Sequence, residues 1–115
     1  MLIGELAKKS GFTRDAIRHY EKIGLLRDPH QRRPNNNYKI YGEDTLLKLH
    51  YLTKLKRMGF SLKQSREVLE LADNPKENWL DIKRKLLKKR SEIEGEIKQL
   101  QDHCAGIDAI LQQYF

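Results

Sequence analysis

Apolar side chains recur at helical spacing over the first 26 residues of the chain. They form two short faces separated by a turn: Ile3, Leu6 and Ala7, then Ala16, Ile17 and Tyr20. The spacing predicts a helix over residues 3–10 that ends at Gly11, and a second helix with Thr13 as its N-cap. Two short helices joined through a glycine turn predict a helix-turn-helix, whose second helix can enter a major groove.

A polar stretch follows these two helices. Residues 28–37 contain two prolines, three asparagines and no apolar side chain, which predicts a loop. The flanking segments Leu25–Arg27 and Tyr38–Tyr41 are apolar or aromatic, and we expect them to pair as a hairpin across this loop. A basic hairpin placed after a helix-turn-helix is a wing.

Two further helices are predicted between the hairpin and Pro75. The first has a broad apolar face and ends at Gly59; the face comprises Leu46, Leu47, Leu49, Leu52, Leu55 and Met58. The second begins at a capping box, in which Ser61 and Gln64 satisfy each other's backbone donors. Its apolar side comprises Leu62, Val68, Leu69 and Leu71. The Asn74-Pro75 pair ends this helix.

Beyond about Trp79 the pattern predicts one long helix. Its apolar positions repeat in heptads and form a dimerisation seam: Leu86, Ile93, Ile97, Leu100, Cys104, Ile107 and Leu111. A small head cannot bury such a stripe, so a second copy of the chain is the simplest partner. The predicted fold is therefore mainly α: a winged helix-turn-helix DNA-binding domain over residues 1–74 and a dimerisation helix over 75–115.

The positive charge lies in the half with the helix-turn-helix. Residues 1–60 hold 13 Lys and Arg against 6 Asp and Glu, whereas residues 61–115 hold 10 of each. A basic surface on a helix-turn-helix indicates double-stranded DNA as the partner. We expect the DNA contacts to come from the start of the second helix and from the wing: Thr13, Arg14, Arg18, Tyr20, Arg32, Arg33, Tyr38 and Lys39.

Several of these residues also have a structural interpretation. Tyr20 could be a core aromatic of the head, and Arg32 and Arg33 could be solvated loop residues. The wing tyrosines could stabilise a hairpin by aromatic packing, an interpretation that suits Tyr41 best. Lys54, Lys56 and Arg57 flank the third helix, where one of them could reach a phosphate.

The lone cysteine excludes an internal disulfide. Cys104 could be a redox sensor or, with His103, a metal ligand, but its seam position favours core packing. Trp79 could pack in the dimer interface or line a small pocket. No catalytic constellation, glycine-rich phosphate loop or metal-ligand cluster occurs, so we expect neither an enzyme nor a cofactor or metal site. No signal peptide or membrane-spanning stretch occurs, which favours a cytoplasmic protein.

Four segments together resemble the MerR family of bacterial transcription regulators. They are Ile3–Ala7, Arg18–Leu26, Tyr38–Tyr41 and Met58–Leu62. The resemblance implies a homodimer with an antiparallel coiled coil, and twofold symmetry then implies an inverted-repeat operator. It also implies that binding bends and underwinds the promoter so that RNA polymerase can use it.

The chain departs from the family pattern in four places. His19-Tyr20 replaces two tyrosines, Lys39 replaces the wing arginine, and Ser65 replaces a branched apolar residue. Asn78-Trp79 stands where metal-sensing relatives carry a cysteine. We expect no large effector-binding domain of the kind that multidrug-sensing relatives append, and the inducer, including any small-molecule effector, stays open. The alternatives are an excisionase-like architectural protein and a thiol or small-molecule sensor that acts through protein contacts.

Overall fold

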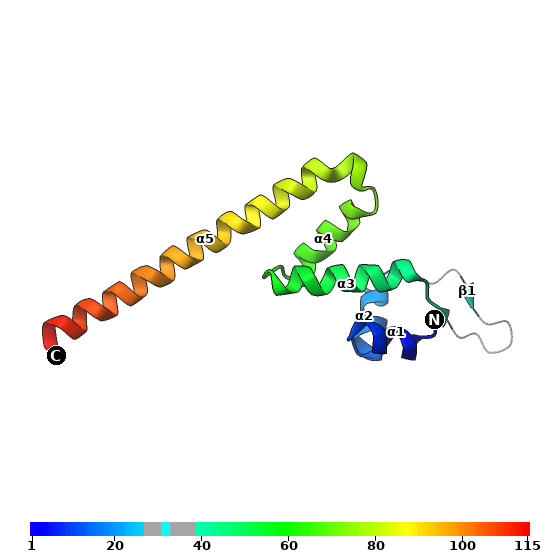
Figure 1. The fold of residues 1–115 in the computed structure, drawn as a ribbon, viewed down its shortest axis with the longest axis horizontal. Helices are drawn as coiled ribbons and strands as arrows, with labels where there is room; N and C mark the ends of the chain where they lie inside the picture. Colours follow the sequence, from blue (N-terminus) through cyan, green and yellow to red (C-terminus); the bar gives the residue numbers. More distant parts are fainter. Residues whose placement is uncertain (27–30, 33–38) are drawn as a thin grey trace. The chain divides into compact units, whose positions relative to one another are not determined.

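The computed structural model describes residues 1–26, 31–32 and 39–115 of the chain. Its elements, drawn in Figure 1, are α1 (Ile3–Ser10), α2 (Arg14–Lys22), β1 (Gln31–Arg32), β2 (Lys39–Ile40), α3 (Glu43–Arg57), α4 (Leu62–Ala72) and α5 (Pro75–Tyr114). The chain divides into two compact units, Met1–Asp73 and Asn74–Phe115. The prediction of a mainly α fold, with a winged helix-turn-helix head and a long C-terminal helix, is confirmed.

The helix-turn-helix forms where its local signals place it. Gly11 ends α1 with a φ of 82°, and its N–H donates to the carbonyl of Ala7. Thr13 begins α2, and its Oγ1 accepts a hydrogen bond of 3.1 Å from the N–H of Ala16. Because a left-handed glycine and a threonine cap act over single turns, these ends follow from sequence without tertiary information.

The core of the head joins the four short helices. Helix α1 packs against α2 and α3, and α3 packs against α4. The buried apolar side chains are Leu6, Ile17, Tyr20, Leu25, Leu26, Tyr41, Leu49, Leu52, Leu55, Phe60, Val68 and Leu69. The apolar face predicted for α3 is too broad, since Leu47 and Met58 are exposed. Leu49, Leu52 and Leu55 are the buried side chains of this helix.

The predicted strand pairing of the wing is wrong on one side. Strand β2 pairs antiparallel with Gln31–Arg32 and not with Leu25 or Leu26. Arg27, the last residue of the predicted partner segment, lies outside the described residues. The N–H groups of Leu25 and Leu26 both donate to the carbonyl of Tyr20, after Gly24 turns the chain at a φ of 80°. Both leucines are buried, so they close the C-terminal end of α2 instead of forming a strand.

Helix α4 begins at the predicted capping box. Ser61 Oγ accepts from the N–H of Gln64 at 3.1 Å, and Gln64 Oε1 accepts from the N–H of Ser61 at 2.9 Å. One turn later, Ser65 is 0% exposed, and its Oγ has no hydrogen-bond partner among the described residues. The helix therefore carries a buried hydroxyl at a position where an apolar side chain would fit its surroundings.

Ser65→Ala is expected to stabilise the head by about 1 kcal/mol, because it removes a polar group that is desolvated without compensation. The melting temperature followed by circular dichroism should rise by a few degrees. The matched control is Ser61→Ala, which removes the N-cap and should cost about 1 kcal/mol. A lower melting temperature for Ser65→Ala would mean that the hydroxyl is satisfied in solution.

Helix α5 starts where the dimerisation helix was bounded, earlier than the apolar pattern alone indicates. It begins at Pro75 instead of near Trp79, and it runs for 40 residues, about 60 Å. Proline at the first helical position loses no hydrogen bond and has a φ suited to a helix, so Pro75 both stops α4 and starts α5. No residue of α5 is buried in the single chain. Within the described residues, no helix is apolar enough over a sufficient length to span a membrane.

Candidate nucleic-acid interface

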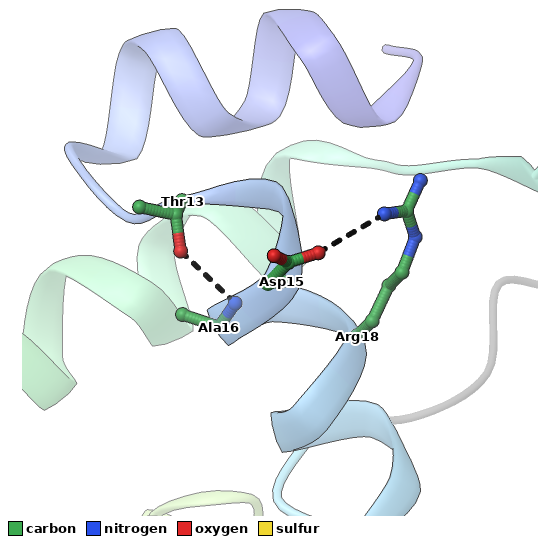
Figure 2. Close-up of polar contacts among 4 residues, drawn as sticks. All are labelled: Thr13, Asp15, Ala16 and Arg18. Atoms are coloured by element: carbon green, nitrogen blue, oxygen red, sulfur yellow. Dashed lines mark hydrogen bonds and ion pairs between the residues drawn. The ribbon is translucent and has the colours of Figure 1, made fainter.

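The start of α2 presents polar and basic side chains to solvent. Thr13, Arg14 and Arg18 are all exposed. Figure 2 shows the Thr13 cap and an ion pair one turn later, in which Arg18 Nη1 lies 3.4 Å from Asp15 Oδ1. The Arg18 side chain is 60% exposed and that of Asp15 is 96% exposed. Such a pair contributes little in water, so Arg18 can exchange Asp15 for a phosphate or a base edge.

Arg14 lies against the first turn of α1. A Cβ atom placed on Gly4 would come within 2.7 Å of Arg14 Nη2, so the guanidinium rests over the bare backbone of this glycine. A larger residue at position 4 would displace the end of a flexible side chain, and the backbone would stay in place. Gly4 therefore influences where Arg14 is held.

Gly4→Ala should keep the fold intact, or stabilise α1 slightly, while weakening DNA binding about three- to tenfold through the displaced Arg14. Melting temperature and gel-shift affinity would be measured together. The control is Gly95→Ala in α5, where an added Cβ has no neighbour within 4 Å. Unchanged affinity in Gly4→Ala would show that Gly4 does not influence DNA binding through Arg14.

The structure places Tyr20 in the core of the head. Its side chain is 6% exposed, and its ring meets that of Phe12 edge to face at 5.5 Å between centroids. A tyrosine buried in this way offers too little surface for a phosphate contact. The burial of Tyr20 favours its core interpretation over the predicted DNA contact.

The wing residues are only partly described. Arg32 lies in β1, whereas Arg33 and Tyr38 lie outside the described residues. Lys39 in β2 has a partner within the head, because its Nζ lies 2.7 Å from Oε2 of Glu21. The hydroxyl of Tyr41 donates to the other oxygen of the same carboxylate. Tyr41 is buried, as its structural interpretation predicts.

Glu21 was missed by the sequence analysis. It occupies the last turn of α2, where the helix dipole disfavours an acidic side chain. An acidic residue at the C-terminal end of a helix is unfavourable by itself. Together with the basic and aromatic strand that follows, it could have indicated that Glu21 has partners in that strand.

A second basic surface lies on the head between the α1–α2 turn and α3. A shallow hollow there is lined by Ser10, Gly11, Phe12, Thr53, Lys56 and Arg57. Lys54 stands next to it, with its Nζ 5.5 Å from the centre of the Tyr51 ring. The hollow brings two of the three cations at the C-terminal end of α3, Lys56 and Arg57, beside the turn that precedes α2.

The seam residues of α5 lie on the surface of the single chain. Ile97 is 50% exposed, Leu100 is 62% exposed, and Cys104 is also exposed. Within the part of the chain that the structure describes, no group of three or more His, Cys, Asp or Glu side chains could hold a metal ion. From Ile93 to Leu111 the seam forms an apolar stripe, and a stripe of this length is normally covered by another helix.

A winged helix-turn-helix with exposed arginines on its second helix, followed by one long helix, defines a DNA-binding transcription regulator. Residues 1–72 match the MerR HTH family of regulatory proteins, and residues 46–110 match the family described as MerR, DNA binding. The chain belongs to the MerR family, whose members are regulators and not enzymes.

Relatives support this assignment at both the sequence and the structure level. The chain is 39% identical over 101 residues to the HTH-type transcriptional regulator CueR of Escherichia coli O6:H1, covering 88% of this chain and 73% of CueR. It superposes with PbrR691 of Ralstonia metallidurans CH34, solved with lead(II), at a TM-score of 0.80 and 26% identity, covering 95% and 84% of the two chains. EcmrR, solved with DNA in EcmrR-RPo, gives 0.70 and 27%, covering 98% of this chain and 39% of EcmrR.

Proposed function

We propose that the protein binds an inverted-repeat promoter site as an antiparallel homodimer and controls transcription by bending and underwinding the DNA for RNA polymerase. The observation that carries this proposal is the exposed pair Arg14 and Arg18 at the start of α2, on a head that is followed by an uncovered apolar helix. In each subunit Thr13, Arg14 and Arg18 contact the major groove, and Arg32, Arg33 and Tyr38 contact the flanking backbone through the wing.

The charge along α5 supports pairing with a second copy in the antiparallel direction. Residues 75–91 hold seven Lys or Arg and two Asp or Glu, whereas residues 92–115 hold one basic and five acidic side chains. A parallel pair would place like charges together over the whole helix. An antiparallel pair places the basic half of each helix beside the acidic half of its partner, which favours this orientation.

Nearly full overlap of two antiparallel helices also brings the middle of the apolar seam of one helix onto the middle of the other. In this register Ile93 lies opposite Ile97 of the partner, and Leu86 lies opposite Cys104 of the partner. The single cysteine of each chain is then far from its counterpart and packs against a leucine. This register supports core packing as the role of Cys104.

Twofold symmetry links the dimer to its DNA site. Two heads related by a dyad read two half-sites of opposite direction, so the operator is an inverted repeat. Bending is the expected means of control, because two heads joined in one dimer engage both half-sites when the DNA adapts its twist and curvature to their separation. An excisionase-like protein would have no need of a 40-residue helix with a heptad seam.

The proposal is tested by footprinting on the DNA upstream of the protein's own gene. The expected result is protection of one inverted repeat at moderate salt, with hypersensitive cleavage near its centre where the duplex is distorted. A circular-permutation gel shift would measure the bend. Absence of protection at any inverted repeat would contradict sequence-specific regulation.

The helix orientation is tested with the native thiol. Leu86→Cys should form disulfide-linked dimers under mild oxidation, because the introduced thiol lies opposite Cys104 of the partner. The wild-type protein, treated alike, is the control and should stay unlinked. Efficient linkage of the wild-type protein through its single cysteine would indicate a parallel pair.

A further inference from the structure

A nearly buried carboxylate joins α2, the second helix of the helix-turn-helix, to the wing strand β2. The side chain of Glu21, in the last turn of α2, is 5% exposed. Its Oε2 lies 2.7 Å from Lys39 Nζ, and its Oε1 accepts a hydrogen bond from the hydroxyl of Tyr41. Lys39 and Tyr41 flank Ile40 in and directly after β2. Both carboxylate oxygens are therefore used to hold one short strand against one end of α2.

This position is costly for an acidic side chain. The carbonyl end of a helix repels a carboxylate, and removal of the carboxylate from water costs further free energy. The contacts with Lys39 and Tyr41 offset these terms, and both contacts are lost when β2 moves away. The carboxylate thus ties the stability of α2 to the placement of the wing strand.

The backbone next to this cluster is anchored as well. The N–H of Tyr41 donates to the carbonyl of Met1 at 2.7 Å, and the side chain of Tyr41 is buried. The end of β2 is thereby held between the start of the chain and the end of α2. The side chain of Lys39, in contrast, is 35% exposed and lies at the edge of the head. Its ion pair with Glu21 holds the ammonium group in place there.

We propose that Glu21 is a positioning residue for DNA recognition, which holds the wing at a fixed angle to α2 through Lys39 and Tyr41. Lys39 acts as the counter-ion of Glu21 and not as a phosphate contact. The inference rests on the proposed binding of the head to duplex DNA, in which α2 and the wing must engage the same site together.

The two roles of Lys39 make opposite predictions for Glu21→Gln. If Lys39 contacted a phosphate, removal of the neighbouring negative charge would free the ammonium group and strengthen DNA binding. If Glu21 positions the wing, the same substitution weakens DNA binding although it makes the protein more positive. The direction of the change therefore separates positioning from simple electrostatic attraction.

The experiment measures the affinity of the full chain for a duplex of random sequence and for its own upstream region, each at several salt concentrations. Glu21→Gln and Lys39→Met should each weaken binding about tenfold, and the double variant should be no weaker than either, because all three lose one shared interaction. Lys39→Arg should keep wild-type affinity. Asp15→Asn is the matched control, since it removes an exposed carboxylate from the same helix, and it should not weaken binding.

A second readout does not depend on DNA. Hydrogen exchange over residues 39–42 should be faster in Glu21→Gln and Lys39→Met than in the wild type, at an unchanged exchange rate for α3 and α5. Unchanged exchange in β2 would overturn the inference even if the protein bound no DNA, an outcome that would count separately against the proposed function. Tighter DNA binding by Glu21→Gln, or additive losses in the double variant, would also overturn it.

Discussion

Ile97→Glu is expected to convert the protein from a dimer to a monomer and to weaken binding to an inverted-repeat site by at least about a hundredfold. Ile97 is 50% exposed in the single chain and lies in the apolar seam of α5. In the proposed dimer it lies opposite Ile93 of the partner, where an unpaired carboxylate would be desolvated. Loss of the dimer removes the second head, so the second half-site no longer adds to the affinity.

The oligomeric state would be measured by analytical ultracentrifugation and the affinity by gel shift. Gln99→Glu is the matched control: it introduces the same charge two residues later, on a face about 160° away from Ile97. This variant should remain a dimer with wild-type affinity. An Ile97→Glu protein that stayed dimeric would place the contact between subunits somewhere other than the seam.

The helix ends were the best-predicted part of the fold. Gly11, Thr13 and the Ser61–Gln64 box each act through one or two hydrogen bonds within a single turn, so their effect does not depend on the rest of the chain. The periodicity of apolar residues likewise placed Ile17 and Leu52 in the core.

The errors arose where tertiary contacts compete with local pattern. Leu25-Leu26 has the composition of a strand, but the N–H groups of both leucines donate to the carbonyl of Tyr20. These hydrogen bonds place the two residues in a turn after α2. Leu47 and Met58 lie on the apolar side of their helix, but the core is too small to cover that whole side. Pro75 stops one helix and starts another, and only the first of these effects was recognised.

The candidate DNA-binding site likewise has one part that local sequence predicts and one part that depends on tertiary contacts. The exposed arginines at the start of α2 could be placed from sequence, because a cap and a helical period determine which face they occupy. The contact of Lys39 with Glu21 joins residues that are 18 positions apart, across a turn and a loop. A local sequence pattern cannot predict an ion pair between residues so far apart in the chain. Lys39 was therefore predicted as a DNA contact, whereas the structure gives it an internal partner.

Arg18→Ala should weaken binding to the operator about 5- to 150-fold, the range for loss of one good contact to a base or phosphate. Arg18 is exposed on α2, and its ion pair with Asp15 is weak enough to be exchanged for DNA. A contact to a phosphate would lower the salt slope of the affinity by about 0.9 for each head, with equal loss on all sequences. A contact to a base edge would instead relax the preference at one position of each half-site.

Gel-shift titrations at several salt concentrations, on the operator and on single-base variants of it, separate these cases. The chain offers a close control in α5, where Arg84 pairs with Asp81 at 3.5 Å and the same three-residue spacing as Arg18 with Asp15. Arg84→Ala loses an equivalent surface ion pair on the helix face opposite the seam, so it should leave both affinity and salt slope unchanged. If Arg84→Ala weakened binding as much as Arg18→Ala, general charge would explain the loss. If only Arg18→Ala did so, the start of α2 would be the surface that meets the DNA.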